Sequence, residues 1–164
     1  MNMSIREGET LPAATFVRKG ADGPEAVELA GLTKGRRIVI VAVPGAFTPT
    51  CHSAHMPTII AEHDAIRAKG VDEVIVLSVN DMHVMKLWGE ETGAEAAGIT
   101  LLADPESTFT KAIGMNFTAP ATGMIDRSSR YVMVVDDGVV SRFQIEDKAG
   151  GCALTGGQAI LDLL

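Results

Sequence analysis

Residues 36–51 read RRIVIVAVPGAFTPTC, and this stretch decides the fold. Its first part, 36–43, is a β-branched run with apolar residues on both faces, which predicts a central strand buried by helices on both sides. A proline–glycine loop ends the strand. Apolar residues at helical spacing then predict a helix over residues 50–69. The strand and the loop therefore place Cys51 in the first turn of a helix.

The same alternation of strand and helix continues along the chain. The sequence EVIVLSV predicts a second buried strand, and an Asn-Asp pair after it can cap a helix through its side-chain oxygens. Further on, an Asp-Pro pair suits the start of another helix, because proline is favoured at the first helical position. The predicted elements are a strand at 73–79, a helix at 82–91 capped by Asn80 and Asp81, a short strand at 101–102 and a short helix from Asp104 and Pro105 to Ile113.

The two ends of the chain show a different pattern. Residues 11–29 alternate weakly and are interrupted by DGP at 22–24, which suits an amino-terminal hairpin. Residues 130–145 hold two apolar runs around an Asp-Gly turn, which predicts an antiparallel hairpin, and residues 155–164 predict a terminal helix. The sequence therefore predicts an α/β protein with a thioredoxin-like fold, a central mixed β-sheet flanked by helices on both faces.

Length and composition narrow the class of protein. The 164 residues predict a single domain over residues 1–164, and the charge of −7 disfavours binding to nucleic acid or to an anionic membrane. The amino terminus is no secretory signal, and the longest aliphatic run is too short to span a membrane, so we expect a cytoplasmic protein. The four histidines lack metal-ligand spacing and no glycine-rich nucleotide motif occurs, so we expect neither a metal nor a cofactor.

Cys51 lies at a predicted helix amino terminus, a position at which thiols become reactive. Unpaired N–H groups and the positive dipole end at a helix amino terminus stabilise a thiolate. A free cysteine is often simply a small buried hydrophobe. Against that alternative, Thr48, Thr50 and Ser53 make the surroundings polar, and the Pro/Gly loop fixes the backbone around them. We therefore expect a nucleophilic cysteine.

The segment resembles a known signature. Pro44, Thr48 and Cys51 have the spacing of the P-x-x-x-[TS]-x-x-C motif of the peroxiredoxins, and VPGAFTPTC followed by His55-Met-Pro is similar to their type-II branch. Further matches follow in order along the chain. They are SVND at 78–81, WG at 88–89, LLADP at 101–105 and RYVMVVDDG at 130–138.

The resemblance implies roles for individual residues. Cys51 would attack a hydroperoxide and become a sulfenic acid. Thr48 would hydrogen-bond the peroxide and the thiolate, Arg130 would place a cation beside the sulfur, and Pro44 would shield the thiolate from water. His55, one helical turn after Cys51, would orient the thiolate or the arginine, or else it is a surface histidine. By composition alone, Arg130 would not differ from the two other arginines near it, Arg127 and Arg142.

The resemblance also implies the partners. They are a hydroperoxide substrate, a thiol reductant (glutathione, glutaredoxin or thioredoxin) and a second copy of the chain in a homodimer, with Phe47, Met82 or Phe117 supplying the contact. Cys152 lies where some relatives carry a resolving cysteine, but it falls two residues early when the terminal helices are aligned. Either Cys152 closes a disulfide with Cys51 or an external thiol resolves the sulfenic acid. We favour the external thiol, glutathione with or without glutaredoxin.

Three other functions compete with the peroxidase. A thioredoxin-type oxidoreductase would need a second cysteine three residues after Cys51, where Ala54 stands. A cysteine hydrolase would need an oxyanion-hole motif, which the sequence does not display. A redox-sensing or holdase module with a reactive cysteine that does not turn over is the remaining alternative.

Overall fold

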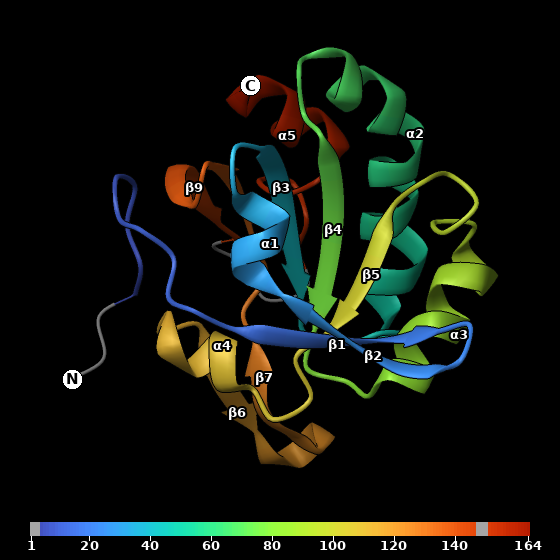
Figure 1. Cartoon of the computed structure of the whole chain (residues 1–164). Helices are drawn as coiled ribbons and strands as arrows, with labels where there is room; N and C mark the ends of the chain where they lie inside the picture. Colours follow the sequence, from blue (N-terminus) through green and yellow to red (C-terminus); the bar gives the residue numbers. More distant parts are fainter. Residues whose placement is uncertain (1–3, 147–150) are drawn as a thin grey trace.

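The computed structural model describes residues 4–146 and 151–164, and its centre is a seven-stranded mixed sheet. The strand order is β2-β1-β5-β4-β3-β8-β9 (Figure 1). Strand β3 pairs parallel with β4, the middle strand, and antiparallel with β8, so it lies in the interior of the sheet. The strands are β1 (Thr15–Gly20), β2 (Gly23–Glu28), β3 (Arg37–Val43), β4 (Glu73–Ser78), β5 (Thr100–Ala103), β8 (Tyr131–Asp136) and β9 (Val139–Ile145).

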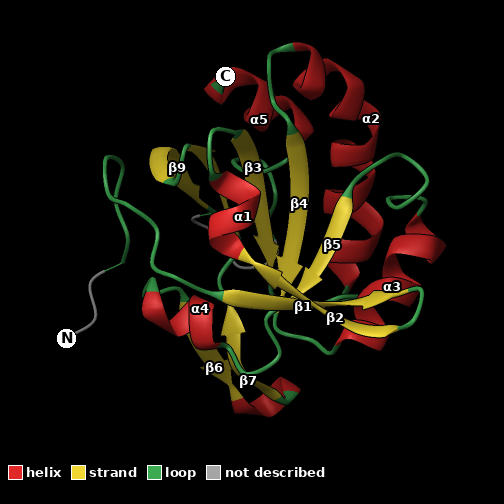
Figure 2. Ribbon diagram, in the orientation of Figure 1, coloured by secondary structure: helices red, strands yellow, loops and turns green. Residues whose placement is uncertain are grey.

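Helices cover both faces of the sheet (Figure 2). Alternate residues of β3 divide between two cores, because successive side chains of a strand point to opposite faces. Val39 and Val41 pack with α2, α3 and α5, whereas Ile38 and Ile40 pack with α1 and α4. The helices are α1 (Leu29–Thr33), α2 (Met56–Ala68), α3 (Met82–Thr92), α4 (Thr108–Ala112) and α5 (Gly157–Leu163). The predicted α/β class and the mixed sheet are confirmed.

The helix predicted to begin at Asp104 and Pro105 begins later. α4 starts at Thr108, after Ser107 takes a left-handed conformation with φ 60°. The Asp104 carboxylate nevertheless acts on this helix from a distance, since it accepts hydrogen bonds from the N–H groups of Phe109 and Thr110. The prediction of a proline at the first helical position was therefore wrong, while the acidic residue still stabilises the start of the helix.

A second, two-stranded sheet is formed by the residues that follow α4 and precede β8 along the chain. It has no counterpart in the sequence-based prediction. It is formed by β6 (Asn116–Ala119) and β7 (Met124–Ser128), joined by the short 3₁₀ helix η2 (Pro120–Thr122). Its residues are mostly exposed or half-buried, so they lack the apolar alternation that reveals a strand in sequence.

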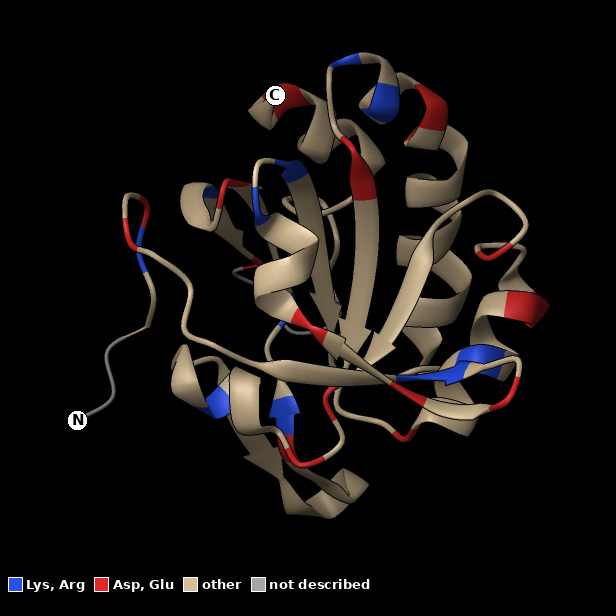
Figure 3. Cartoon of the chain, viewed as in Figure 1, with Lys and Arg blue, Asp and Glu red and all other residues tan. Residues whose placement is uncertain are grey.

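Charges of both signs are distributed over the elements of the fold, without a face of one sign in the view of Figure 3. Several form ion pairs at the surface, such as Arg18 with Glu25 and Lys86 with Glu95. In the described part of the chain, no helix is long and apolar enough to cross a membrane.

Candidate active site

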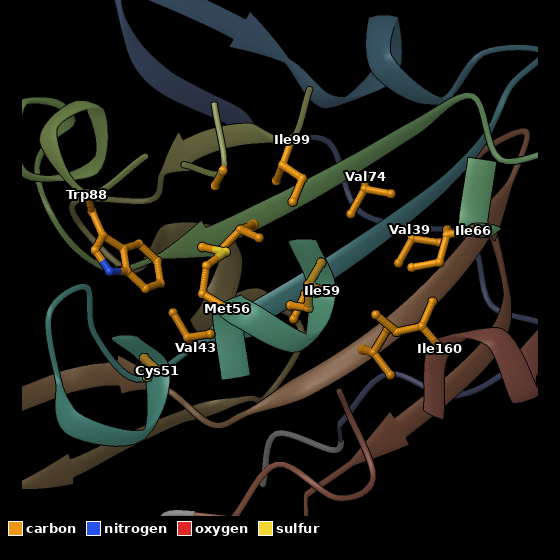
Figure 4. Close-up of a cluster of buried hydrophobic side chains, with 14 of the residues drawn as sticks. Val39, Val43, Cys51, Met56, Ile59, Ile66, Val74, Trp88, Ile99 and Ile160 are labelled. Carbon is orange, nitrogen blue, oxygen red and sulfur yellow. The ribbon is translucent and has the colours of Figure 1, made fainter. Parts of the chain in front are cut away.

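Cys51 lies just beyond the carboxyl end of β3, at the start of a short π-helical turn, η1 (Cys51–His55), that leads into α2. The N–H of Met56 donates to the carbonyl of Cys51, five residues back. Pro57, the next residue, has no N–H to give to an α-helical hydrogen bond, which favours the wider turn at this point. The Cys51 side chain is fully buried at the edge of the core cluster, beside Val43 and Met56 (Figure 4).

Arg130 contacts the sulfur of Cys51 directly. Its Nη2 donates to Sγ at 3.1 Å, and its Nη1 lies 2.6 Å from Nδ1 of His55. Arg130 immediately precedes β8, the antiparallel neighbour of β3, and this pairing brings the guanidinium to the loop that follows β3. The arginine is only 7% exposed. A guanidinium buried against the sulfur can hydrogen-bond negative charge that develops there during a reaction.

His55 is held in one tautomer by its two partners. The guanidinium of Arg130 has no acceptor, so it must donate, and Nδ1 of His55 must be the unprotonated nitrogen. The other nitrogen, Nε2, therefore carries the proton and donates to the carbonyl of Thr155 at 2.8 Å. The side chain is fully buried. The alternative of a surface histidine does not hold, and the geometry connects His55 to Arg130 rather than to the sulfur.

Burial and the neighbouring charge of Arg130 lower the pKa of His55 to about 4, although its hydrogen bond to Thr155 acts in the opposite direction. Because the folded pKa is below that of the unfolded chain, protonation favours unfolding. The contribution to stability is complete above the unfolded pKa of about 6.5 and is lost as the pH falls toward about 4.

We expect replacement of His55 by asparagine to reduce the loss of unfolding free energy that accompanies a fall in pH from 7 to 4. The native protein should lose on the order of 3 kcal/mol of unfolding free energy through this group between pH 7 and pH 4. Denaturant titrations at both pH values measure it. His83→Asn, at an exposed position on α3, is the matched control. Burial also lowers the pKa of His63, so the His55 share is the difference between the native protein and the variant. Equal acid loss in the His55→Asn and His83→Asn variants would contradict the assignment.

The loop before Cys51 is anchored from the neighbouring strand. Oδ1 of Asn80, two residues after β4, accepts from the N–H of Ala46 at 3.0 Å and from the hydroxyl of Ser78 at 2.6 Å. The hydroxyl of Ser78 also lies 3.4 Å from the carbonyl of Val43. Ser78 and Asn80 had no predicted role at this site, although both belong to the SVND segment at 78–81. Their contacts show that they position the loop.

Thr48 and Pro44 lie in this loop and are half-exposed. The Thr48 hydroxyl donates to the carbonyl of Gly45 at 2.7 Å, so in this conformation its proton is directed to the backbone and not to the sulfur. The carbonyl of Pro44 accepts from Nη1 of Arg127 at 3.3 Å, a contact that the sequence analysis did not foresee. Composition did not distinguish Arg127, Arg130 and Arg142. In the structure, Arg127 contacts the loop and Arg130 contacts the thiol that follows it, whereas Arg142 lies exposed on β9.

Two aromatic contacts border the site. Nε1 of Trp88, the only tryptophan of the chain, donates to Nδ1 of His52 at 3.0 Å. The ring of Phe47 stacks on His52 with centroids 5.6 Å apart. Phe47 has a left-handed backbone, with φ 63°, and is 44% exposed. Trp88 is thus a reporter group joined by one hydrogen bond to the residue after Cys51.

The segment that carries Cys152 is hydrogen-bonded to the same region. The carbonyl of Cys152 accepts from the N–H groups of Thr155 and Gly156, and Thr155 in turn accepts from His55. Cys152 itself is half-buried, and both cysteines are free thiols. Residues 147–150, which precede this segment, lie outside the described residues.

A cavity of about 360 Å³ lies elsewhere, lined by residues of β1, α3, β5 and the loop before β5. Two of its three cations, Arg18 and Lys86, are paired with Glu25 and Glu95. Cys51 is absent from its lining. The cavity is therefore separate from the thiol site.

The chain is similar to known proteins over most of its length. A family model described as Redoxin matches residues 6–155. Peroxiredoxin-2C of Oryza sativa subsp. japonica is 37% identical over 161 residues, which are 98% of this chain and 98% of that protein. The chloroplastic peroxiredoxin-2E-2 of the same organism is 42% identical over 93% of this chain and 68% of its own length.

A solved peroxiredoxin structure is also similar to this chain, in both sequence and fold. Reduced Prx3 from Vibrio vulnificus, in complex with hydrogen peroxide, is 41% identical and superimposes with a TM-score of 0.89. The match covers 96% of this chain and 98% of that one. The chain therefore belongs to the Redoxin family and is a peroxiredoxin, a thiol-dependent peroxidase whose relatives are consistent with the type-II branch.

Proposed function

We propose that Cys51 is the nucleophile of the peroxidase reaction. The observation that carries this proposal is the Arg130 guanidinium, which donates to the Cys51 sulfur at 3.1 Å in a buried site. The thiolate attacks the near oxygen of the hydroperoxide and a sulfur–oxygen bond forms. The oxygen–oxygen bond breaks, its electron pair leaves with the far oxygen, and that oxygen takes up a proton as alcohol or water. Cys51 becomes a sulfenic acid.

Arg130 and Thr48 stabilise the transition state in this proposal. The guanidinium lies beside the sulfur, so it can hydrogen-bond an oxygen that approaches Sγ. The Thr48 hydroxyl, now donating to Gly45, can rotate toward a bound peroxide because a hydroxyl both donates and accepts. Pro44 limits the access of water. His55 holds the guanidinium in place from its far side, through Nη1.

We propose that an external thiol regenerates Cys51, with glutathione, alone or through glutaredoxin, favoured over thioredoxin. A thiolate attacks the sulfenic sulfur, water leaves, and a mixed disulfide forms; a second thiol then releases Cys51. The hydrogen bonds around Cys152 support this route. The carbonyl of Cys152 is held by two N–H groups, and Leu154 donates through its N–H to Glu146 while its carbonyl accepts from Gln144. An internal disulfide would have to break such contacts.

Mass spectrometry of the protein after one equivalent of hydrogen peroxide tests both proposals. We expect one added oxygen on the peptide that contains Cys51, trapped by a sulfenic-acid reagent, and a glutathione adduct at the same residue when glutathione follows. The Cys152→Ser variant should behave in the same way. An internal Cys51–Cys152 disulfide in the monomer would overturn the external route and leave the nucleophile in place. Oxygen added only elsewhere would overturn Cys51 as the nucleophile.

We also propose a homodimer formed through the face that carries the active-site loop. Phe47, in the loop before Cys51, is 44% exposed, and Leu87 on α3 is 50% exposed. Met82 and Phe117, the other candidates from the sequence, are half-buried and offer less area. Sedimentation velocity measures the oligomeric state of the reduced protein.

A further inference from the structure

Arg127, like Arg130, places a guanidinium near the loop before Cys51. It lies on β7, opposite Phe117 of β6, and is half-buried. Its Nη1 donates to the carbonyl of Pro44 at 3.3 Å. None of the ion pairs within residues 4–146 and 151–164 includes Arg127. Arg67, Arg130 and Arg142 also form no ion pair in this part of the chain, so Arg127 is distinguished by its place at the loop before Cys51.

The loop leaves room for this side chain. A Cβ built on Gly45 would lie 2.9 Å from Nη1 of Arg127 and 3.1 Å from Cγ2 of Thr48. The guanidinium and the threonine therefore flank the same point in space. Thr48 is the residue that we propose to hydrogen-bond the peroxide, so the charge of Arg127 lies on the same side of the loop as that hydroxyl-bearing side chain.

Arg127 and Arg130 differ in how many of their N–H donors are available to a ligand. Arg130 is 7% exposed, and its Nη1 and Nη2 contact His55 and Cys51, so its free donors face only the space beside the sulfur. Arg127 makes one hydrogen bond in the described structure, to a neutral carbonyl, and a guanidinium has five N–H donors. Its remaining donors have the planar geometry that suits a carboxylate, which binds arginine in a bidentate manner.

We propose that Arg127 binds a carboxylate on the molecule that reacts at Cys51. The inference rests on the proposed function and deepens it. Two sources share this chemistry, a hydroperoxide that carries a carboxylate, such as that of a fatty acid, and a reducing thiol that carries one, such as glutathione. The exposed ring of Phe47 and the half-buried ring of Phe117 give the same region an apolar character. Arg127 is thus a specificity-determining residue, whereas Arg130 serves the chemical step.

The test compares matched anionic and neutral substrates in the two half-reactions. In the first, reduced protein is mixed with linoleic acid hydroperoxide or with its methyl ester, and the fluorescence of Trp88 follows oxidation. In the second, protein oxidised by hydrogen peroxide is mixed with glutathione or with its diethyl ester. The variant is Arg127→Gln. Arg142→Gln, which removes one positive charge from the exposed face of β9, is the control.

We expect the ratio of the anion rate constant to the ester rate constant to fall about tenfold in Arg127→Gln in one half-reaction, and to stay unchanged in Arg142→Gln. The half-reaction that changes identifies the source of the carboxylate. Unchanged ratios in both, or losses of equal size for anion and ester, would overturn the proposal, since a purely structural role affects both substrates alike. Oxidation of Cys51 by hydrogen peroxide is read separately, so the proposed function stands or fails on its own.

Discussion

Replacement of Cys51 by serine is expected to abolish peroxide turnover, with a loss of about a thousandfold or more. A serine hydroxyl remains protonated where a thiol ionises, and oxygen is a weaker nucleophile toward peroxide than a thiolate. The side chains are similar in size, so the buried position beside Val43 and Met56 should still be filled. The measurement is peroxide-dependent consumption of reductant, with glutathione and with a thioredoxin system in parallel.

The matched control is Cys152→Ser, because it removes the other thiol of the chain. We expect this variant to retain at least part of its turnover. Full activity in Cys51→Ser would remove the basis of the mechanism. Stoichiometric oxidation of the native protein without repeated turnover would instead favour the redox-sensing alternative. Trp88 provides a folding check on both variants, because its fluorescence reports the packing next to His52.

Replacement of Arg130 by alanine is expected to slow the oxidation of Cys51 by about a hundredfold to a thousandfold. Loss of a hydrogen-bond donor aimed at developing charge costs about 2.7–4 kcal/mol in other enzymes. The alanine variant also leaves Nδ1 of buried His55 without its donor. Arg130→Lys keeps the charge but cannot hold both His55 and the sulfur, so its rate should lie between those of the native protein and the alanine variant.

Comparison with an alkylating reagent separates two roles of Arg130. Iodoacetamide reacts with the thiolate but has no peroxide oxygens to be stabilised. We expect Arg130→Ala to lose more rate toward hydrogen peroxide than toward iodoacetamide, because the guanidinium also serves the oxygens of the transition state. Arg142→Ala is the control for loss of a positive charge. Equal losses toward both reagents would confine Arg130 to its effect on the sulfur.

The sequence predicted the centre of the molecule well because the centre is set by burial. Residues of β3 are apolar on both faces, and such a run is stable only between two helical layers. The loop and the thiol follow directly from where this strand ends. Arg130 could be selected only by its place in a family motif, since the sequence does not show that β8 pairs with β3.

The parts that escaped prediction depend on long-range contacts or on exposed residues. The start of α4 is shifted because Asp104 reaches across to the N–H groups of Phe109 and Thr110, and Ser107 takes the left-handed turn between them. Strand β7 is too exposed to show an apolar pattern. Arg127 becomes distinct from Arg142 only when β7 brings it to the carbonyl of Pro44.

The contact between Arg130 and Cys51 joins residues that are 79 positions apart in the chain. It depends on the pairing of β3 with β8, so the unfolded polypeptide has a thiol without a fixed cation beside it. We therefore expect the proposed reactivity of Cys51 toward peroxide to require the native fold, and the thiol of an unfolded copy to react as an ordinary cysteine does.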